Sequence, residues 1–181
     1  MVHNTAMYAD DTIVFLSHLA ESIPSLLELL KQFGSVSGFK VNKEKSSIMF
    51  LNVNERENPL VSHPFVNATE EFKYLGIRIT PKISNLSLAN YEPMVVQVSE
   101  EITRWTTLPL SILGRINIIK MTILPKFLYI FQSIPLAPPS FFPRTRKLLS
   151  NFIWNNRKPR LRLSLLYLPY DRGGLQVPNL E

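Results

Sequence analysis

The 181-residue chain contains no cysteine. This absence excludes disulfide bonds, thiolate zinc sites, iron–sulfur clusters and a cysteine nucleophile. Histidine is scarce as well. His3, His18 and His63 are too far apart in the sequence to show the spacing of metal ligands, so we expect no zinc site.

Long apolar runs and targeting segments are also lacking. The first residues show no basic run followed by an apolar stretch. The longest apolar region, residues 108–139, is interrupted by Arg115, Lys120 and Lys126, which is too polar for a membrane span. We therefore expect a soluble intracellular protein, in the nucleus or the cytoplasm. With 45% apolar and 19% charged residues, the composition predicts a folded chain rather than disorder.

Acidic residues are nearly missing from the last 80 residues. Residues 1–101 hold 8 Lys and Arg against 12 Asp and Glu, whereas residues 102–181 hold 12 against 2, a net charge of +10. Such an excess favours a polyanionic partner, with nucleic acid the first candidate. A basic helical surface that only keeps the chain soluble is the alternative. The candidate nucleic-acid-binding residues are Arg157, Lys158, Arg160 and Arg162 in one dense cluster, with Arg115 and Lys120 as weaker candidates on an apolar helix.

The first 80 residues predict a small α+β part. Two apolar runs, residues 3–8 and 12–17, flank Ala9-Asp10-Asp11, which predicts a β-hairpin with the two acids at its tip. Apolar spacing predicts a helix over residues 24–36, which Gly38 would stop. The remaining expectations are a strand at residues 47–51, a loop at residues 52–68 and a β-rich run at residues 71–80.

Beyond residue 81 the apolar period changes to three and four, which predicts helices. The stripes run over residues 88–105, 112–130 and 141–152, and Pro125 should kink or end the second. We expect the first two stripes to pack against each other. Trp105 and Trp154 lie on apolar stripes and are expected in the core rather than as base-stacking platforms. The tail, residues 161–181, is expected to be extended.

The pair Asp10-Asp11 carries the clearest chemistry. Two carboxylates at a rigid hairpin tip present the hard oxygen ligands that Mg²⁺ prefers. Polymerases use two metal ions to clamp the attacking and leaving oxygens of phosphoryl transfer. A surface turn that happens to hold two acids is the alternative interpretation.

Several segments, in order, resemble one family. Tyr8-Ala9-Asp10-Asp11 resembles motif C of reverse transcriptases, a strand–YxDD–strand hairpin. Further segments are similar to motif D, the primer grip, the thumb and the region beyond it in enzymes of non-LTR retrotransposons of the long interspersed element type. They are, respectively, Gly38-Phe39-Lys40-Val41-Asn42-Lys43-Glu44-Lys45-Ser46, Phe72-Lys73-Tyr74-Leu75-Gly76-Ile77, Gly114–Met121 with Ile123–Lys126, and Phe152–Asn155 with Gly173–Leu180.

The resemblance implies an α+β fold with three parts. Residues 1–82 would be the C-terminal part of the palm, with its β-hairpin, helix and short antiparallel strands. Residues 83–156 would be a helical thumb bundle, and residues 157–181 a basic extended tail. The parent enzyme would be an RNA-directed DNA polymerase that uses Mg²⁺ to extend a DNA primer on an RNA template.

The resemblance also assigns roles. Asp10 would be a metal ligand and Asp11 a second one. Lys45 would donate a proton to the leaving pyrophosphate, unless it is a solvated lysine at a strand edge. The primer-grip residues Tyr74, Leu75 and Gly76 would place the primer end. The alternative interpretation is that they only pack as an ordinary strand, with Gly76 in a bulge.

Motifs A and B of the family should precede the hairpin, and only seven residues precede Tyr8. We therefore expect a truncated copy without polymerase activity of its own. Two alternatives stay open, a non-catalytic basic nucleic-acid-binding module and a helical protein-interaction domain.

Overall fold

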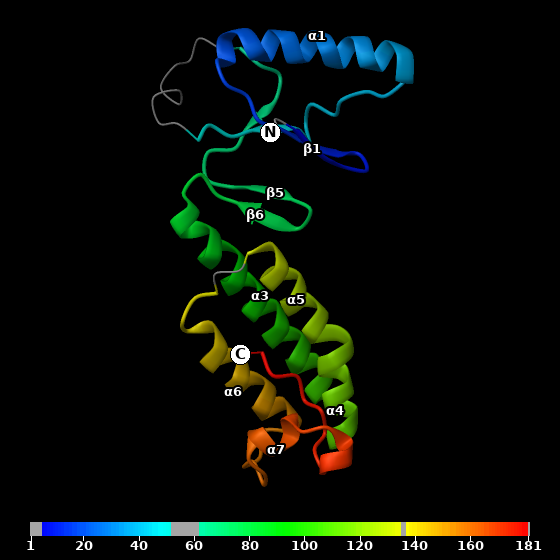
Figure 1. Ribbon diagram of the computed structural model, residues 1–181, viewed down its shortest axis with the longest axis vertical. Coiled ribbons are helices and arrows are strands. Elements are labelled where there is room, and N and C mark those ends of the chain that lie inside the picture. The colour runs from blue at the N-terminus through cyan, green and yellow to red at the C-terminus, as the bar shows by residue number, and fades with distance from the viewer. Residues whose placement is uncertain (1–4, 52–61, 135–136, 181) are drawn as a thin grey trace. The chain divides into compact units, whose positions relative to one another are not determined.

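We describe the chain from a computed structural model over residues 5–51, 62–134 and 137–180. The chain divides into two units, residues 1–82 and residues 83–181 (Figure 1). The first combines short strand pairs with a helix, and the second is helical. The predicted α+β class is confirmed.

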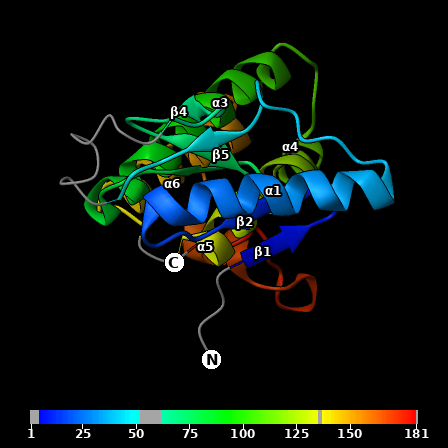
Figure 2. The same ribbon diagram turned by 90° about the horizontal axis from the view of Figure 1, so that it is seen from above.

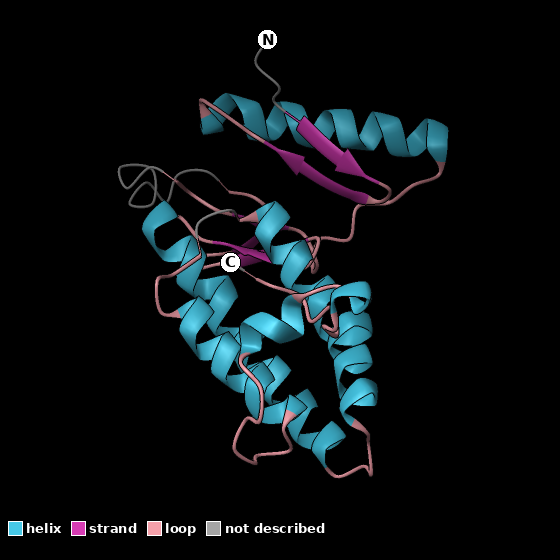
Figure 3. Cartoon of the chain, turned by 60° about the horizontal axis from the view of Figure 1, so that its bottom comes forward, coloured by secondary structure: helices cyan, strands magenta, loops and turns pink. Residues whose placement is uncertain are grey.

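The predicted β-hairpin is confirmed at the start of the first unit. Strand β1 (Thr5–Tyr8) pairs antiparallel with β2 (Asp11–Val14), and Tyr8 stands opposite Asp11. Helix α1 (Leu19–Ser37) runs alongside this hairpin (Figures 2 and 3). Gly38 ends α1 as predicted, since its φ of 77° places it in the left-handed region and its N–H donates to the Gly34 carbonyl.

Helix α1 begins five residues before the predicted start. A helix that starts at residue 24 would have Pro24 in its first turn, where proline is favoured. In the structure Pro24 lies inside the helix, and Ile23, just before it, is fully buried. The apolar spacing could not reveal this earlier start because the first turn is exposed or half-buried.

Two further strand pairs complete the first unit. Strands β3 (Ser47–Ile48) and β4 (Val66–Asn67) pair in parallel, so part of the expected loop is a strand and the expected strand at 47–51 is shorter. This pairing joins residues far apart in sequence and has no local signal. Residues 52–61 of the expected loop lie outside the described residues. Strands β5 (Phe72–Tyr74) and β6 (Ile77–Ile79) form a second antiparallel hairpin.

The second unit is built from the predicted helical stripes. Helix α3 (Ile83–Thr106) packs against α5 (Leu124–Ser133) and α6 (Phe141–Ile153), which confirms that the first two stripes meet (Figure 1). No helix in the described stretches combines the length and the apolarity needed to cross a membrane.

Pro125 interrupts the second stripe as predicted, through a widened turn. Helix α4 (Ile112–Ile118) continues into a five-residue π-helix, Ile119–Ile123, and then into α5. Pro125 has no N–H for the carbonyl four residues earlier, and its ring would clash with that carbonyl in a regular helix. A π turn just before Pro125 accommodates both effects.

The core of the second unit contains an aromatic cluster. Tyr91, Phe127 and Phe141 are fully or almost fully buried, and the Tyr91 and Phe141 ring centroids are 4.9 Å apart in an edge-to-face arrangement. The Tyr91 hydroxyl donates to the Ile134 carbonyl at 2.6 Å. Burial raises the pKa of this phenol above its ordinary value.

The two tryptophans differ in burial. Trp154 is buried, as expected. Trp105, one residue before the end of α3, is only half-buried, so its assignment to the core was wrong.

The tail is not simply extended. It forms a short helix, α7 (Leu163–Tyr167), and a 3₁₀ turn, Tyr170–Arg172. Leu166 in α7 is almost fully buried, which explains why this stretch folds. Beyond Gly173 the chain is extended, and the N–H groups of Leu175 and Val177 both donate to the Leu166 carbonyl.

Candidate metal and nucleic-acid sites

The acidic pair lies at the tip of the β1–β2 hairpin. Tyr8 and Asp11 are paired across the strands, so Ala9 and Asp10 form a two-residue turn, with Ala9 at a φ of 52°. Asp10 and Asp11 are exposed, and Tyr8 is 66% exposed. The structure therefore presents both carboxylates to solvent at one place.

This pair fits a divalent cation only in part. Carboxylate oxygens are suitable ligands for Mg²⁺, which relies on one or two carboxylates together with water and substrate phosphates. In the part of the chain that the structure describes, no group of three His, Cys, Asp or Glu side chains could hold a metal ion. The hairpin thus supplies two donors.

The residues around Lys45 form a turn that Asn42 organises. The Asn42 Oδ1 accepts from the N–H groups of Glu44 and Lys45, each at 3.1 Å, and the Asn42 carbonyl accepts from the Ser46 hydroxyl at 2.7 Å. Within the predicted motif, the backbone is therefore shaped by Gly38, Asn42 and Ser46. The Lys45 residue is exposed to solvent.

The predicted primer-grip residues form a tight turn, not a bulge. Tyr74 pairs with Ile77, and Leu75 and Gly76 between them have φ values of 47° and 84°. Two consecutive positive φ values are typical of a type I′ hairpin turn, which glycine tolerates and leucine does not favour. The alternative reading of Gly76 as a bulge is wrong because no extra residue stands between the paired strands.

The basic cluster Arg157, Lys158, Arg160 and Arg162 is exposed. It follows α6 after a turn in which Asn155 and Asn156 have φ values of 52° and 59°. The Asn156 N–H donates to the Asn151 carbonyl at 2.8 Å, and the Arg157 N–H to the Trp154 carbonyl at 3.0 Å. The three ion pairs found among described residues involve none of the four cluster residues.

Arg115 does not belong to a nucleic-acid surface, and that expectation is corrected. Its side chain is only 3% exposed. Its guanidinium donates to the Leu110 carbonyl at 3.3 Å and the Phe152 carbonyl at 3.1 Å, and lies 5.4 Å from the Phe152 ring centroid. A group held in this way ties α4 to α6 and cannot meet a phosphate.

Lys120 is engaged within the second unit as well. Its ammonium donates to the Leu175 carbonyl at 3.5 Å and lies 5.5 Å from the Tyr170 ring centroid. The residue is half-buried. It is therefore a weaker candidate for a phosphate contact than the four cluster residues.

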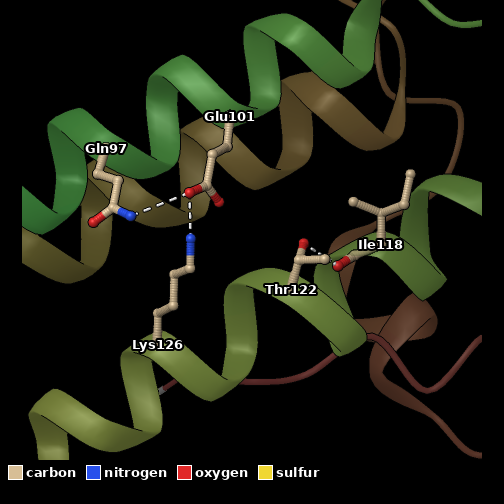
Figure 4. A network of polar contacts seen from close by, with 5 residues as sticks. All are labelled: Gln97, Glu101, Ile118, Thr122 and Lys126. Atoms are coloured by element: carbon tan, nitrogen blue, oxygen red, sulfur yellow. Dashed lines mark hydrogen bonds and ion pairs between the residues drawn. The ribbon is translucent and has the colours of Figure 1, made fainter.

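The sequence reasoning missed a polar network between α3 and α5 (Figure 4). Lys126 points from α5 towards Glu101 of α3 and forms an ion pair with its carboxylate, which also accepts from Gln97 at 3.2 Å. The Glu101 side chain is 13% exposed. A helical i, i+4 spacing links Gln97 and Glu101. No local sequence signal reveals that Lys126, 25 residues after Glu101, is its ion-pair partner.

Two comparisons relate the sequence of this chain to known proteins. Residues 2–79 match the family of reverse transcriptases (RNA-dependent DNA polymerases). The chain is also 23% identical to the Retrovirus-related Pol polyprotein from type-2 retrotransposable element R2DM of Drosophila melanogaster, over 99% of this chain. The aligned part is 18% of that relative.

The matched family segment ends at β6 and includes the acidic hairpin, the Asn42 turn and the tight Leu75-Gly76 turn. Both matches support a relationship of this chain to the reverse transcriptases of non-LTR retrotransposons. Members of this family use a divalent metal such as Mg²⁺.

Proposed function

We propose that this chain contributes the metal-binding hairpin and a nucleic-acid-holding helical unit to an RNA-directed DNA polymerase. The observation that carries the proposal is the exposed pair of carboxylates at the tip of the β1–β2 hairpin, with Asp10 in the two-residue turn and Asp11 at the start of β2. Its substrates would be an RNA template, a DNA primer and incoming nucleotides. Residues 1–82 would then form the C-terminal part of the palm, and residues 83–156 the thumb.

In this proposal Asp10 and Asp11 hold Mg²⁺. The metal, when bound, neutralises charge on the phosphates of the incoming nucleotide. The strand pairing fixes the two carboxylates in advance, which matters because phosphoryl transfer depends mainly on positioning and charge stabilisation. Lys45, exposed on the Asn42 turn, would supply the proton for the leaving pyrophosphate.

The tight turn at Leu75 and Gly76 fits a primer contact. A leucine at a φ of 47° is held in a conformation that costs free energy, and such positions cluster at functional sites. In this proposal the turn would place the primer end through Tyr74, Leu75 and Gly76.

Metal binding is tested by Mn²⁺ titration monitored by NMR. Mn²⁺ broadens the signals of nearby nuclei, so we expect loss of signals from residues 5–14 first, at millimolar rather than micromolar metal. Excess Mg²⁺ should restore them. Asp10→Asn should abolish this local broadening, and Glu21→Gln, an exposed acid on α1, should leave it unchanged. Equal broadening in the Asp10→Asn variant would contradict the assignment.

A non-catalytic nucleic-acid-binding function is the second candidate, and the four exposed, ion-pair-free residues of the basic cluster favour it. Binding through phosphates alone reads no sequence. Each neutralised duplex phosphate adds about −0.9 to the slope of log affinity against log salt, so four contacts predict a slope of roughly −3 to −4.

This slope is measured by fluorescence anisotropy on the whole chain between low and physiological salt. Replacement of all four cluster residues by Ala should flatten the slope and weaken binding equally across sequences. Replacement of four exposed lysines of the first unit, Lys31, Lys40, Lys73 and Lys82, removes the same charge and should have a small effect. A flat slope for the unaltered chain would leave the protein-interaction alternative.

A further inference from the structure

A groove lies between the end of α6 and the basic cluster. Its volume is about 390 Å³. The lining residues are Ser150, Trp154, Pro159, Arg160, Leu161, Arg162 and Leu163. This volume is near the lower end of the range of about 300–1,000 Å³ for small-molecule sites, so the groove suits one small unit rather than a broad surface.

The lining of the groove combines positively charged and apolar side chains. It holds two guanidinium groups, one hydroxyl and four largely apolar side chains, and no carboxylate. Arginine offers a planar fork of donors that matches phosphate oxygens, and its flat face also stacks on bases. The groove therefore combines a site for an anion with a site for an apolar, flat surface.

The turn after α6 fixes this arrangement. Asn155 and Asn156 both adopt left-handed conformations, and hydrogen bonds from Asn156 and Arg157 fasten the turn to the end of the helix. The segment then reaches α7, whose Leu166 is buried. The segment that carries Arg160 and Arg162 is therefore anchored at both ends.

We propose that this groove binds one unpaired nucleotide of a single strand of RNA or DNA. Arg160 and Arg162 contact its phosphodiester, and its base lies against Pro159, Leu161 and Leu163. This inference rests on the proposed nucleic-acid binding and deepens it. Duplex would gain little from the apolar lining because its bases are stacked and paired, whereas an unpaired base exposes its flat face.

The inference predicts that only part of the basic cluster distinguishes single strands from duplex. Arg160 and Arg162 line the groove, and Arg157 and Lys158 do not. Two double variants with equal loss of charge, Arg160→Ala/Arg162→Ala and Arg157→Ala/Lys158→Ala, separate the two roles. All four positions are exposed, so both variants should keep the fold, which circular dichroism and thermal melting would verify.

The experiment measures the affinity of the whole chain for a labelled RNA strand, a DNA strand of the same sequence and the matching DNA duplex. We expect the groove variant to weaken binding of single strands about tenfold more than binding of duplex. The Arg157→Ala/Lys158→Ala control should weaken all three alike. Leu161→Ser should weaken single-strand binding without changing the salt slope, because it removes no charge. A preference for the RNA strand that the Arg160→Ala/Arg162→Ala variant loses would show that the groove also contacts the 2′-hydroxyl.

Two outcomes would overturn the inference, and they are distinguishable. If both double variants weaken single strands and duplex to the same extent, the groove is not a nucleotide site, although charge-based binding stands. If the unaltered chain binds none of the three at low salt, the proposed nucleic-acid binding itself fails.

Discussion

At the scale of the residue, surroundings decide what a charged side chain does. Arg115 and Arg157 were both candidates for nucleic-acid binding from the sequence, Arg115 the weaker one because it lies on an apolar helix. In the structure Arg115 is buried and bonded to two main-chain carbonyls, whereas Arg157 is exposed. One is a structural cross-link between helices and the other is available to a partner.

Replacement of Arg115 by Met should therefore lower the stability of the second unit. The methionine fills much of the space but donates no hydrogen bond, so the Leu110 and Phe152 carbonyls lose a donor. We expect a decrease of about 2–3 kcal/mol in the free energy of unfolding, measured by urea denaturation.

The matched control is Arg157→Met, which should change stability by less than about 0.5 kcal/mol. The two variants should have the opposite ranking in nucleic-acid affinity. A stable Arg115→Met protein with a reduced salt slope would return Arg115 to the binding surface.

The candidate site itself could largely be read from single residues. Asp10 and Asp11 were placed at a hairpin tip because acids between two apolar runs mark a turn, and the structure has this turn. The burial of Arg115 could not be foreseen, because its partners are a loop carbonyl and a residue 37 positions away.

At the scale of the element, helices with a long apolar period and the hairpin β1–β2 were predicted, and the parallel pair β3–β4 was not. The stripe that became α3 repeats over many turns and therefore carries a strong local signal. The parallel pair β3–β4 spans two residues per strand and depends on contacts between distant segments. Helix α7 was missed because a single buried residue, Leu166, holds it in place.

The Gly173-Gly174 pair shows what an element can require of one residue. Gly173 has a φ of 75° and ends the 3₁₀ turn. A Cβ atom on Gly174 would lie 1.9 Å from the Leu168 carbonyl oxygen, a main-chain atom that cannot rotate away. The extended segment after Gly174 can approach α7 this closely only because the side chain is absent.

Gly174→Ala should therefore destabilise the second unit by about 2–3 kcal/mol, in the manner of an overpacked core. Thermal melting of the whole chain measures the effect. Gly114→Ala is the control, and we expect it to raise the stability of the second unit rather than lower it. A Cβ there would lie at an acceptable 3.4 Å from the Ser111 hydroxyl, and alanine favours a helix over glycine by up to about 1 kcal/mol. Equal melting temperatures for the two variants would contradict the close approach.

At the scale of the whole molecule, the two units differ in the size of their hydrophobic cores. Among the described residues of the first unit only Ile23 and Ile77 are buried, whereas the second unit has a continuous core. The exposed apolar residues of α1 include Leu29, Phe33 and Val36. The hairpin with its carboxylates thus belongs to the unit with the smaller core.

These 181 residues on their own should not extend a primer, with either Mg²⁺ or Mn²⁺. Two-metal catalysis needs more ligands than the two carboxylates of the hairpin, and in the described parts of the chain no third His, Cys, Asp or Glu side chain joins them in a group that could hold a metal ion. The assay would measure nucleotide incorporation on a primed RNA template, with an active reverse transcriptase as the positive control. Incorporation that Asp10→Asn abolishes would prove this expectation wrong.

The contact between Lys120 and Leu175 has a consequence for synthesis on the ribosome. The two residues are 55 positions apart in the sequence. Tyr170, whose ring also contacts the Lys120 ammonium, lies 50 positions after Lys120. At about 5–20 residues per second, roughly 3–11 s pass between the translation of Lys120 and that of Leu175. During this interval α4 and its π turn exist without the segment that later packs on them. The nascent second unit therefore lacks the contacts of Lys120 with Tyr170 and Leu175 until that segment has been translated.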